Sequence, residues 1–222
     1  MIDLVEARRM MVAGQVRTND VTDLRVQEAM LEVMRERFVP PQWQALSYLD
    51  LDVPVQAGAP GQPARYLLKP MVLAKLMQAA DLEAGDRVLD VGCATGYSSA
   101  VLSRIVQSVV ALEEEPLVRA ARDALAEFGA GNITVTAGRL TDGCPSRAPF
   151  DVILLNGATE VAPQTLLGQL KDGGGLVCVL TRGPAGKATI YRSDRGHVSA
   201  HTLFDAAAPL LPGFAKPAEF VF

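Results

Sequence analysis

Apolar residues along this chain form short continuous runs that alternate with longer stretches of helical spacing. The short runs predict buried strands at 87–91, 109–113, 133–136, 150–155 and 174–181. The stretches between them predict helices at 96–106, 116–128 and 163–171. Strands that alternate with helices in this way are typical of an α/β fold, so we expect a doubly wound, mostly parallel sheet.

The first 70 residues lack this alternation and predict a helical extension. Helical spacing of apolar residues indicates helices at 3–14 and 22–36, with Asp20 or Thr22 as the candidate cap of the second. Residues 50–70 are rich in proline and glycine, which predicts an irregular loop.

Single residues of this N-terminal part carry further expectations. Pro70 can begin a helix that continues through Ala80, because proline is tolerated in the first turn. The arginines of Arg8–Arg9 and Arg35–Arg37 are expected on solvated helix faces. Trp43 is expected to pack the N-terminal part against the sheet.

The pattern changes again near the C-terminus. The runs 187–192 and 198–204 flank the turn Ser193-Asp194-Arg195-Gly196, and this arrangement predicts an antiparallel hairpin. A final short strand is predicted near 218–222.

Composition narrows the class of protein. The chain has 222 residues, of which 49% are hydrophobic, and a net charge of −4, which argues against an electrostatic nucleic-acid binder. The cysteines Cys93, Cys144 and Cys178 include no C-x-x-C pair and indicate neither a zinc ribbon nor a disulfide framework. His197 and His201 lack a third ligand, so we expect no metal site. The N-terminus is unlike a signal peptide and no apolar run reaches transmembrane length, so we expect a cytoplasmic protein without membrane contact.

The stretch RVLDVGCATGYSSAVL, residues 87–102, carries the candidate chemistry. Asp90 and Gly92 lie at the carboxyl end of a predicted strand, where open α/β sheets bind ligands. Gly92 and Gly96 bracket a turn whose spacing matches neither the dinucleotide fingerprint G-x-G-x-x-G nor a Walker phosphate loop. About twenty residues further on, Glu113 ends the next predicted strand, where an acid commonly binds a ribose diol. The residues therefore predict a nucleoside-type cofactor site.

An acid-x-Gly-x-x-x-Gly turn without a phosphate requirement resembles the first motif of S-adenosylmethionine-dependent methyltransferases. Over nearly its whole length the chain also resembles the protein-L-isoaspartate O-methyltransferases. The segments that carry this resemblance lie at 11–12, 15–17, 21–23, 29–30, 37–40, 48–50, 88–103, 131–133, 147–151, 163, 169–170, 173–177 and 204–210. The segments RFVP at 37–40 and APFD at 148–151 are the most specific to that family.

The resemblance implies direct methyl transfer from S-adenosylmethionine to the carboxylate of an isoaspartyl residue in a damaged protein. Such a carboxylate is already an anion at neutral pH, so no general base is expected and no catalytic side chain is assigned. The implied cofactor-binding residues are Asp90, Gly92, Cys93, Ala94, Gly96, Glu113, Arg139, Leu140 and Asn156. The implied organisation is a helical segment with a substrate loop at 1–70, followed by the S-adenosylmethionine-binding α/β domain at 71–222.

Three features depart from the family pattern. The family's substrate loop, Gly-Gln-Thr-Ile-Ser before a proline, is absent, and counting back from Pro70 places Leu68 where the family has its substrate-contacting serine. Arg139 replaces an acid that accepts from the adenine amino group, and Ala94 replaces the middle glycine of the turn. The substrate-loop candidates are Arg65, Tyr66, Leu68 and Lys69.

These departures leave two alternatives open beside isoaspartyl methylation. Leu68 and the longer loop would suit a methyltransferase with a different acceptor. Arg139 and Ala94 would suit a catalytically inactive homologue that binds the nucleoside cofactor weakly or not at all.

Overall fold

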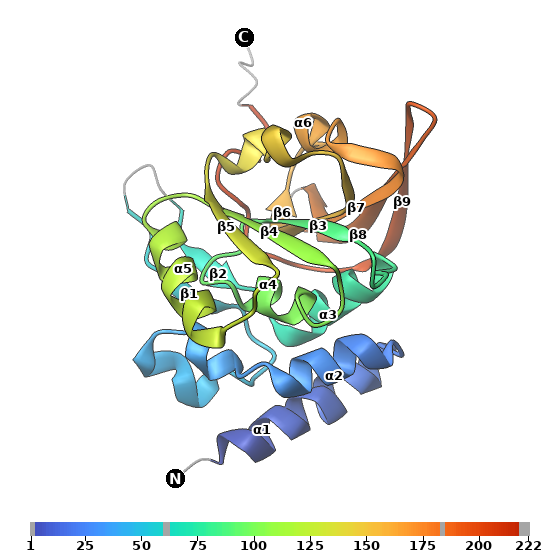
Figure 1. Ribbon diagram of the computed structural model, residues 1–222. Coiled ribbons are helices and arrows are strands. Elements are labelled where there is room, and N and C mark those ends of the chain that lie inside the picture. The colour runs from blue at the N-terminus through green and yellow to red at the C-terminus, as the bar shows by residue number, and fades with distance from the viewer. Residues whose placement is uncertain (1–2, 60–62, 183–184, 218–222) are drawn as a thin grey trace.

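The computed structural model describes residues 3–59, 63–182 and 185–217 of the chain (Figure 1). Its described residues form a central seven-stranded sheet in the order β5-β4-β3-β6-β7-β8-β9. The strands are β3 (Arg87–Val91), β4 (Ser108–Glu113), β5 (Ile133–Ala137), β6 (Phe150–Thr159), β7 (Leu170–Arg182), β8 (Ala185–Asp194) and β9 (His197–Asp205). Strands β3 to β7 pair in parallel, and β8 and β9 add antiparallel pairs at one edge. The predicted doubly wound, mostly parallel sheet with an antiparallel C-terminal hairpin is confirmed.

Alternate side chains of the central strands pack on the two faces of the sheet. In β3, Val88 belongs to the hydrophobic cluster on one face, whereas Leu89 and Val91 belong to the cluster on the other. Both faces are covered, which explains why the strand is a continuous apolar run. From β3 the chain continues into β4 on one side, and β6 pairs with β3 on the other. The switch in strand order therefore lies between β3 and β6, where open sheets bind ligands.

The helices of the α/β unit lie on both sides of this sheet (Figure 1). They are α3 (Pro70–Ala79), α4 (Tyr97–Leu102), α5 (Leu117–Phe128) and α6 (Gln164–Leu167), with the 3₁₀ turns η5 (Leu140–Asp142) and η6 (Pro145–Arg147). The helices α3, α4 and α5 lie below the sheet in Figure 1, and α6 lies above it. The helix predicted at 163–171 is shorter than expected because the chain joins the sheet as β7 from Leu170.

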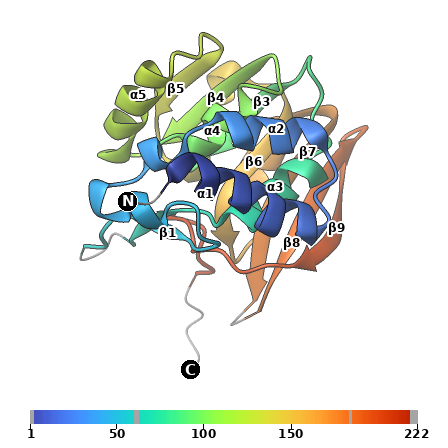
Figure 2. The same cartoon turned by 90° about the horizontal axis from the view of Figure 1, so that it is seen from below.

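The N-terminal segment is helical and packs on the same side of the sheet as α3 and α4 (Figure 2). Its elements are α1 (Leu4–Met11), the π-helix η1 (Val12–Val16), α2 (Leu24–Glu32), and the 3₁₀ turns η2 (Arg17–Asn19), η3 (Arg35–Phe38) and η4 (Pro41–Leu46). The predicted cap of the second helix is wrong. Asp23 caps α2 by accepting a hydrogen bond from the Arg25 N–H at 2.9 Å, whereas Asp20 has a left-handed backbone with φ of 64°.

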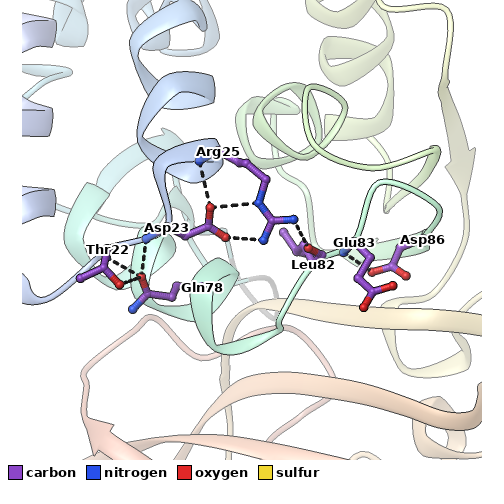
Figure 3. Close-up of polar contacts among 7 residues, drawn as sticks. All are labelled: Thr22, Asp23, Arg25, Gln78, Leu82, Glu83 and Asp86. Atoms are coloured by element: carbon purple, nitrogen blue, oxygen red, sulfur yellow. Dashed lines mark hydrogen bonds and ion pairs between the residues drawn. The ribbon is translucent and has the colours of Figure 1, made fainter.

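Polar contacts attach α2 to α3 and to the segment after α3 (Figure 3). The Gln78 Oε1 atom accepts hydrogen bonds from the N–H groups of Thr22 at 2.6 Å and of Asp23 at 2.9 Å. Arg25 continues this contact, since its Nη1 donates to the Leu82 carbonyl oxygen at 2.7 Å. The start of α2 is thereby fixed against the α/β unit.

The prediction of a solvated helix face is wrong for Arg35, whose side chain is fully buried. Its Nε donates to the Ser47 carbonyl oxygen and its Nη2 to the Leu68 carbonyl oxygen, each at 2.8 Å. The guanidinium lies 4.7 Å from the centroid of the Tyr97 ring, and burial lowers its pKa. Trp43, by contrast, packs against the main hydrophobic cluster, as expected.

The irregular loop predicted at 50–70 contains two short strands. Strands β1 (Val53–Gln56) and β2 (Arg65–Leu67) pair antiparallel and form a ribbon separate from the central sheet. Its few residues and its prolines and glycines gave no alternating pattern long enough to indicate strands. The ribbon leads directly into α3, which begins at Pro70 as predicted.

The C-terminal hairpin of β8 and β9 has the predicted turn. Arg195 and Gly196 have φ values of 48° and 80°, the left-handed pair that joins two strands tightly. The strand predicted near 218–222 lies outside the described residues.

Candidate functional site

The turn between β3 and α4 is tight and left-handed at three positions. Gly92, Ala94 and Gly96 have φ values of 77°, 53° and 97°. The Gly92 N–H donates to the Leu112 carbonyl oxygen at 2.9 Å, which ties the turn to β4. At Gly96 a Cβ would lie 2.8 Å from Leu125 Cγ, so only glycine fits there. The sequence therefore places a backbone loop, with little side-chain bulk, at the carboxyl ends of β3 and β4.

Glu113, the predicted ribose ligand, is fully buried at the end of β4, and each of its carboxylate oxygens accepts two hydrogen bonds. Oε1 accepts from Arg65 Nη1 at 2.6 Å and from the Glu114 N–H at 2.8 Å. Oε2 accepts from Arg65 Nη2 at 2.7 Å and from the Ala94 N–H at 2.7 Å. Arg65 and Glu113 thus form a buried bidentate ion pair. The sequence indicated both residues as site candidates but gave no sign of their contact, because they are 48 positions apart.

Asp90, at the end of β3, is fully buried and only half satisfied. Its Oδ2 accepts from the hydroxyls of Ser98 and Ser99, each at 2.6 Å, while its Oδ1 has no partner in the described residues. Burial raises the pKa of this carboxyl to about 6, and the two hydroxyls oppose that rise. Sequence reasoning missed the serines, although their place directly after the glycine turn, in the first turn of a predicted helix, was a usable signal.

Asn156 joins this cluster from β6. Its Nδ2 donates to Ser98 Oγ at 2.5 Å, and its Oδ1 is buried without a partner in the described residues. Asp90 and Asn156 therefore both hold an unpartnered acceptor and share Ser98 as a neighbour. Buried acceptors of this kind are suited to a donor that the protein itself does not supply, such as an ammonium group.

The tail after β9 crosses the carboxyl end of β6. The Ala158 N–H donates to the Pro209 carbonyl oxygen at 2.8 Å, and the Leu211 N–H donates to the Ala158 carbonyl oxygen at 3.0 Å. A Cβ on Gly157 would lie 2.6 Å from Leu211 Cγ. No local pattern indicates a role for Leu211, because more than fifty residues separate it from the strand it covers.

The space over Gly92 is filled by the protein's own side chains. A Cβ built on Gly92 would lie 3.1 Å from Leu211 Cδ2 and 3.3 Å from Arg65 Nη2. Both side chains are nearly inaccessible to solvent. A ligand that approaches the backbone of Gly92 would therefore have to displace them.

The remaining predicted cofactor residues lie beside these groups. Cys93 is fully buried, and burial raises the pKa of its thiol, which keeps it uncharged. Leu140 is fully buried and donates its N–H to Glu114 Oε1 at 3.2 Å, whereas Arg139 is exposed. Leu140 is therefore part of the apolar packing next to the end of β4, and Arg139 is a solvated cation.

The substrate-loop candidates are not equivalent. Leu68 is buried in the main hydrophobic cluster, and its carbonyl oxygen accepts from Arg35. Tyr66 and Lys69 are half-buried, and the Lys69 N–H donates to Asp52 Oδ1 at 2.9 Å. Of the four candidates, Arg65 contacts a predicted cofactor residue, Glu113, through its side chain.

The donors and acceptors at this edge of the sheet fit a nucleoside that carries an amino-acid group. The Glu113 carboxylate is suited to a ribose diol, and the unpartnered oxygens of Asp90 and Asn156 are suited to an ammonium. Among the described residues there is no group of three or more His, Cys, Asp or Glu side chains that could hold a metal ion, and His197 and His201 are exposed on β9. No helix in the described part of the chain is long and apolar enough to cross a membrane.

A parallel sheet of this order, with an acid-glycine turn after β3 and a buried acid at the end of β4, defines a Rossmann-like methyltransferase. The family model "Protein-L-isoaspartate(D-aspartate) O-methyltransferase (PCMT)" matches residues 7–205. Protein-L-isoaspartate O-methyltransferase 2 of Anaeromyxobacter sp. (strain Fw109-5) is 40% identical over 184 residues, which cover 82% of this chain and 72% of the relative. The chain belongs to the protein-L-isoaspartate O-methyltransferase family.

Solved structures share the fold over nearly the whole chain. A protein-L-isoaspartate O-methyltransferase superposes with a TM-score of 0.80 at 24% identity, over 93% of this chain and 66% of that one. The Plasmodium falciparum beta-aspartate methyltransferase (PCMT), described in complex with S-adenosyl-L-homocysteine, superposes with a TM-score of 0.77 at 18% identity, over 92% of this chain and 97% of that one. At these identities the likeness is one of fold.

Proposed function

We propose that this chain is an S-adenosylmethionine-dependent carboxyl methyltransferase that acts on L-isoaspartyl residues of damaged proteins. The observation that carries the proposal is the buried carboxylate of Glu113 at the end of β4, one strand away from the half-satisfied Asp90 at the end of β3. In a chain of this family, the pair supports a cofactor whose ribose binds Glu113 and whose amino-acid group binds near Asp90.

The positions of the other predicted cofactor residues suggest which part of the cofactor each would contact. The unpartnered Oδ1 of Asn156 would accept from the same ammonium as Asp90. The buried Leu140 would provide apolar contact for the adenine, beside the solvated Arg139. The small backbone turn from Gly92 to Gly96 would let the cofactor approach the ends of the strands.

The chemistry needs alignment and no proton transfer. When bound, S-adenosylmethionine supplies a methyl group on a positively charged sulfur. The isoaspartyl carboxylate is an anion at neutral pH and can attack that methyl directly, so the protein's task is to hold the two reactants in line. Orientation of two reactants in this way can supply on the order of 7 kcal/mol of the barrier.

Methyl transfer to matched peptides tests the proposal. We expect labelled methyl from S-adenosylmethionine to appear as a base-labile ester on an isoaspartyl peptide, and not on the aspartyl peptide of the same sequence. A folded preparation that binds S-adenosylhomocysteine but leaves the isoaspartyl peptide unmethylated would overturn the acceptor. Incubation with protein and small-molecule extracts would then identify the class of acceptor.

The ribose assignment has its own test. Glu113→Gln keeps the shape of the side chain and removes its charge. We expect it to weaken S-adenosylhomocysteine binding about tenfold or more in calorimetry, since hydrogen bonds to a charged group contribute roughly 1.5–3 kcal/mol. Because Arg65 also pairs with Glu113, the same substitution is measured in an Arg65→Gln background, where an unchanged affinity would mean that the ribose binds elsewhere.

A further inference from the structure

We propose that Arg65 exchanges partners during the reaction: it neutralises Glu113 while the cofactor is absent, and it binds the acceptor's carboxylate after the cofactor's ribose has taken Glu113. The inference rests on the proposed function, because it requires a ribose at Glu113 and an anionic acceptor. It makes Arg65 a specificity-determining residue and sets an order of binding, with the cofactor first.

Glu113 has no acceptor position left for a ribose. A carboxylate offers about four lone-pair sites, and here each of them faces a donor within 2.8 Å. Two of the donors are the backbone N–H groups of Ala94 and Glu114, which the glycine turn and β4 hold in place. The other two are the Nη atoms of Arg65, at the end of a side chain with several rotatable bonds. A ribose diol can therefore form hydrogen bonds with the Glu113 carboxylate only by displacing Arg65.

Arg65 also takes up space that a bound cofactor needs, and the fold allows it to leave. Its Nη2 lies 3.3 Å from the position of a Cβ on Gly92, at the switch point of the sheet. The side chain comes from β2, which pairs with β1 in the separate ribbon. Moving Arg65 therefore breaks no hydrogen bond of the central sheet.

A displaced Arg65 needs a new anion, because a buried guanidinium without a partner is strongly unfavourable. The residues that follow it, Tyr66 to Lys69, include no acid. Asp90 is not that anion in this proposal. Its Oδ2 already accepts from two serine hydroxyls, and its Oδ1 would accept from the ammonium group of the cofactor. The isoaspartyl acceptor of the proposed reaction brings its one free carboxylate to this place, and the planar guanidinium binds a carboxylate through two parallel hydrogen bonds, which leaves lone pairs on its oxygens for the attack on the methyl.

The exchange also explains how an acceptor is recognised without the family's serine. Leu68 offers no hydroxyl at that position and is buried in the core. Arg65, three positions earlier in the chain, offers several N–H donors once Glu113 releases it. By linkage, the cofactor should raise the acceptor's affinity, and the acceptor should raise the cofactor's affinity by the same factor.

Calorimetry with S-adenosylhomocysteine tests the first half of the exchange. We expect Arg65→Gln to bind it about tenfold more tightly than the wild type, since a charged competitor for Glu113 is removed, and Arg65→Lys to lie between them. Arg65→Lys retains the charge and so remains informative if Arg65→Gln folds poorly. Arg119→Gln, on the exposed face of α5, should bind like the wild type. Equal or weaker binding by both Arg65 variants would overturn the proposal.

Binding of a fluorescent isoaspartyl peptide tests the second half. We expect S-adenosylhomocysteine to tighten peptide binding about tenfold in the wild type and to have no such effect in Arg65→Gln. In turnover, Arg65→Gln should raise the KM for the peptide with a smaller change in kcat. Peptide affinity that is independent of S-adenosylhomocysteine in the wild type would overturn the exchange. A folded wild type and folded variants that all fail to bind S-adenosylhomocysteine would instead overturn the proposed function.

Discussion

Ala94 holds a left-handed backbone conformation, with φ of 53°, in the middle of the glycine turn. That conformation costs an L residue about 1–2 kcal/mol, and part of this cost is offset because glycine loses more entropy on folding. We predict that Ala94→Gly leaves the free energy of unfolding within about 0.5 kcal/mol of the wild type, because the loss of a fully buried methyl group, about 0.8 kcal/mol, offsets the remaining relief of strain. Urea denaturation measures the change.

Ala126 provides the matched control for this substitution. It lies on the exposed face of α5 in ordinary helical conformation, where glycine is less favourable than alanine by about 1 kcal/mol. Ala126→Gly should therefore lower the free energy of unfolding. Two losses of similar size would contradict the claim that Ala94 is strained.

Asp90 makes the free energy of unfolding depend on pH, and the direction of the change follows from its pKa. Burial raises its pKa to about 6, so between pH 4 and 6 the folded chain binds more protons at this site than the unfolded chain does. The contribution of Asp90 to the free energy of unfolding therefore falls as the pH rises through this window.

Asp90→Asn isolates that contribution from other carboxyl groups. We predict that the variant gains stability relative to the wild type between pH 4 and 6, by up to about 3 kcal/mol, and that the difference is constant above pH 7. Denaturation of both proteins across this range measures it. A difference that is independent of pH would show that Asp90 does not titrate there.

At the residue scale, the sequence predicts what depends on local spacing. Asp90, Gly92 and Glu113 could be placed because each stands at the end of an apolar run. The ion pair of Arg65 with Glu113 and the burial of Arg35 could not, because each depends on a contact between distant segments. The residues next to an arginine in a short polar stretch do not show whether its side chain becomes buried when the chain folds.

At the scale of elements, the contact between α2 and α3 depends on one side chain. Gln78 accepts from two backbone N–H groups at the start of α2 (Figure 3), and its Nε2 donates to the Asp20 carbonyl oxygen at 2.9 Å. Gln78→Met keeps a similar volume and removes these three hydrogen bonds, together with a fourth that the Thr22 hydroxyl donates to Gln78 Oε1 at 3.4 Å. We predict a loss of about 2 kcal/mol in the free energy of unfolding.

Gln78→Glu serves as the control in the same denaturation experiment. It replaces the donor to Asp20 by a second oxygen, but its charge strengthens the hydrogen bonds that it accepts from Thr22 and Asp23, so its loss should be the smaller of the two. Equal losses of the free energy of unfolding in the two variants would mean that the hydrogen bonds from the Thr22 and Asp23 N–H groups to Gln78 do not contribute to stability.

Elements were predictable where a pattern extended over several residues. The strands β3, β4 and β5 lie within one residue of their predicted bounds, because both faces of each are buried or half-buried. The ribbon of β1 and β2 was missed, since three or four residues are too few to show a period of two. The cap of α2 was misplaced because Asp20, Thr22 and Asp23 are all suitable residue types, and only the turn geometry selects Asp23.

At the scale of the whole molecule, the tail after β9 closes over the site. A Cβ on Gly157 would lie 2.6 Å from Leu211 Cγ and 3.0 Å from the Pro209 carbonyl oxygen. We predict that Gly157→Ala displaces the tail, lowers the free energy of unfolding by about 1–3 kcal/mol and increases proteolysis of the C-terminal segment. Gly85→Ala, whose Cβ would meet no atom within 4 Å, should leave both properties nearly unchanged.

The class of fold was predictable from the alternation of strands and helices, but the arrangement over the site was not. The tail reaches β6 from more than fifty residues away, and the ribbon carries Arg65 to β4 across the glycine turn. Local patterns do not encode such long-range placements. The sequence thus indicates the acids of the site, and the structure adds the side chains that occupy the space around them.

In the proposed function, Glu113 binds the ribose of a nucleoside cofactor, at a position that Arg65 occupies when the cofactor is absent. A crystal structure of the chain with S-adenosylhomocysteine tests this most directly. We predict that both ribose hydroxyls contact the Glu113 carboxylate, with Arg65 displaced from it. A nucleoside bound elsewhere, with the pair of Arg65 and Glu113 intact, would contradict the claim.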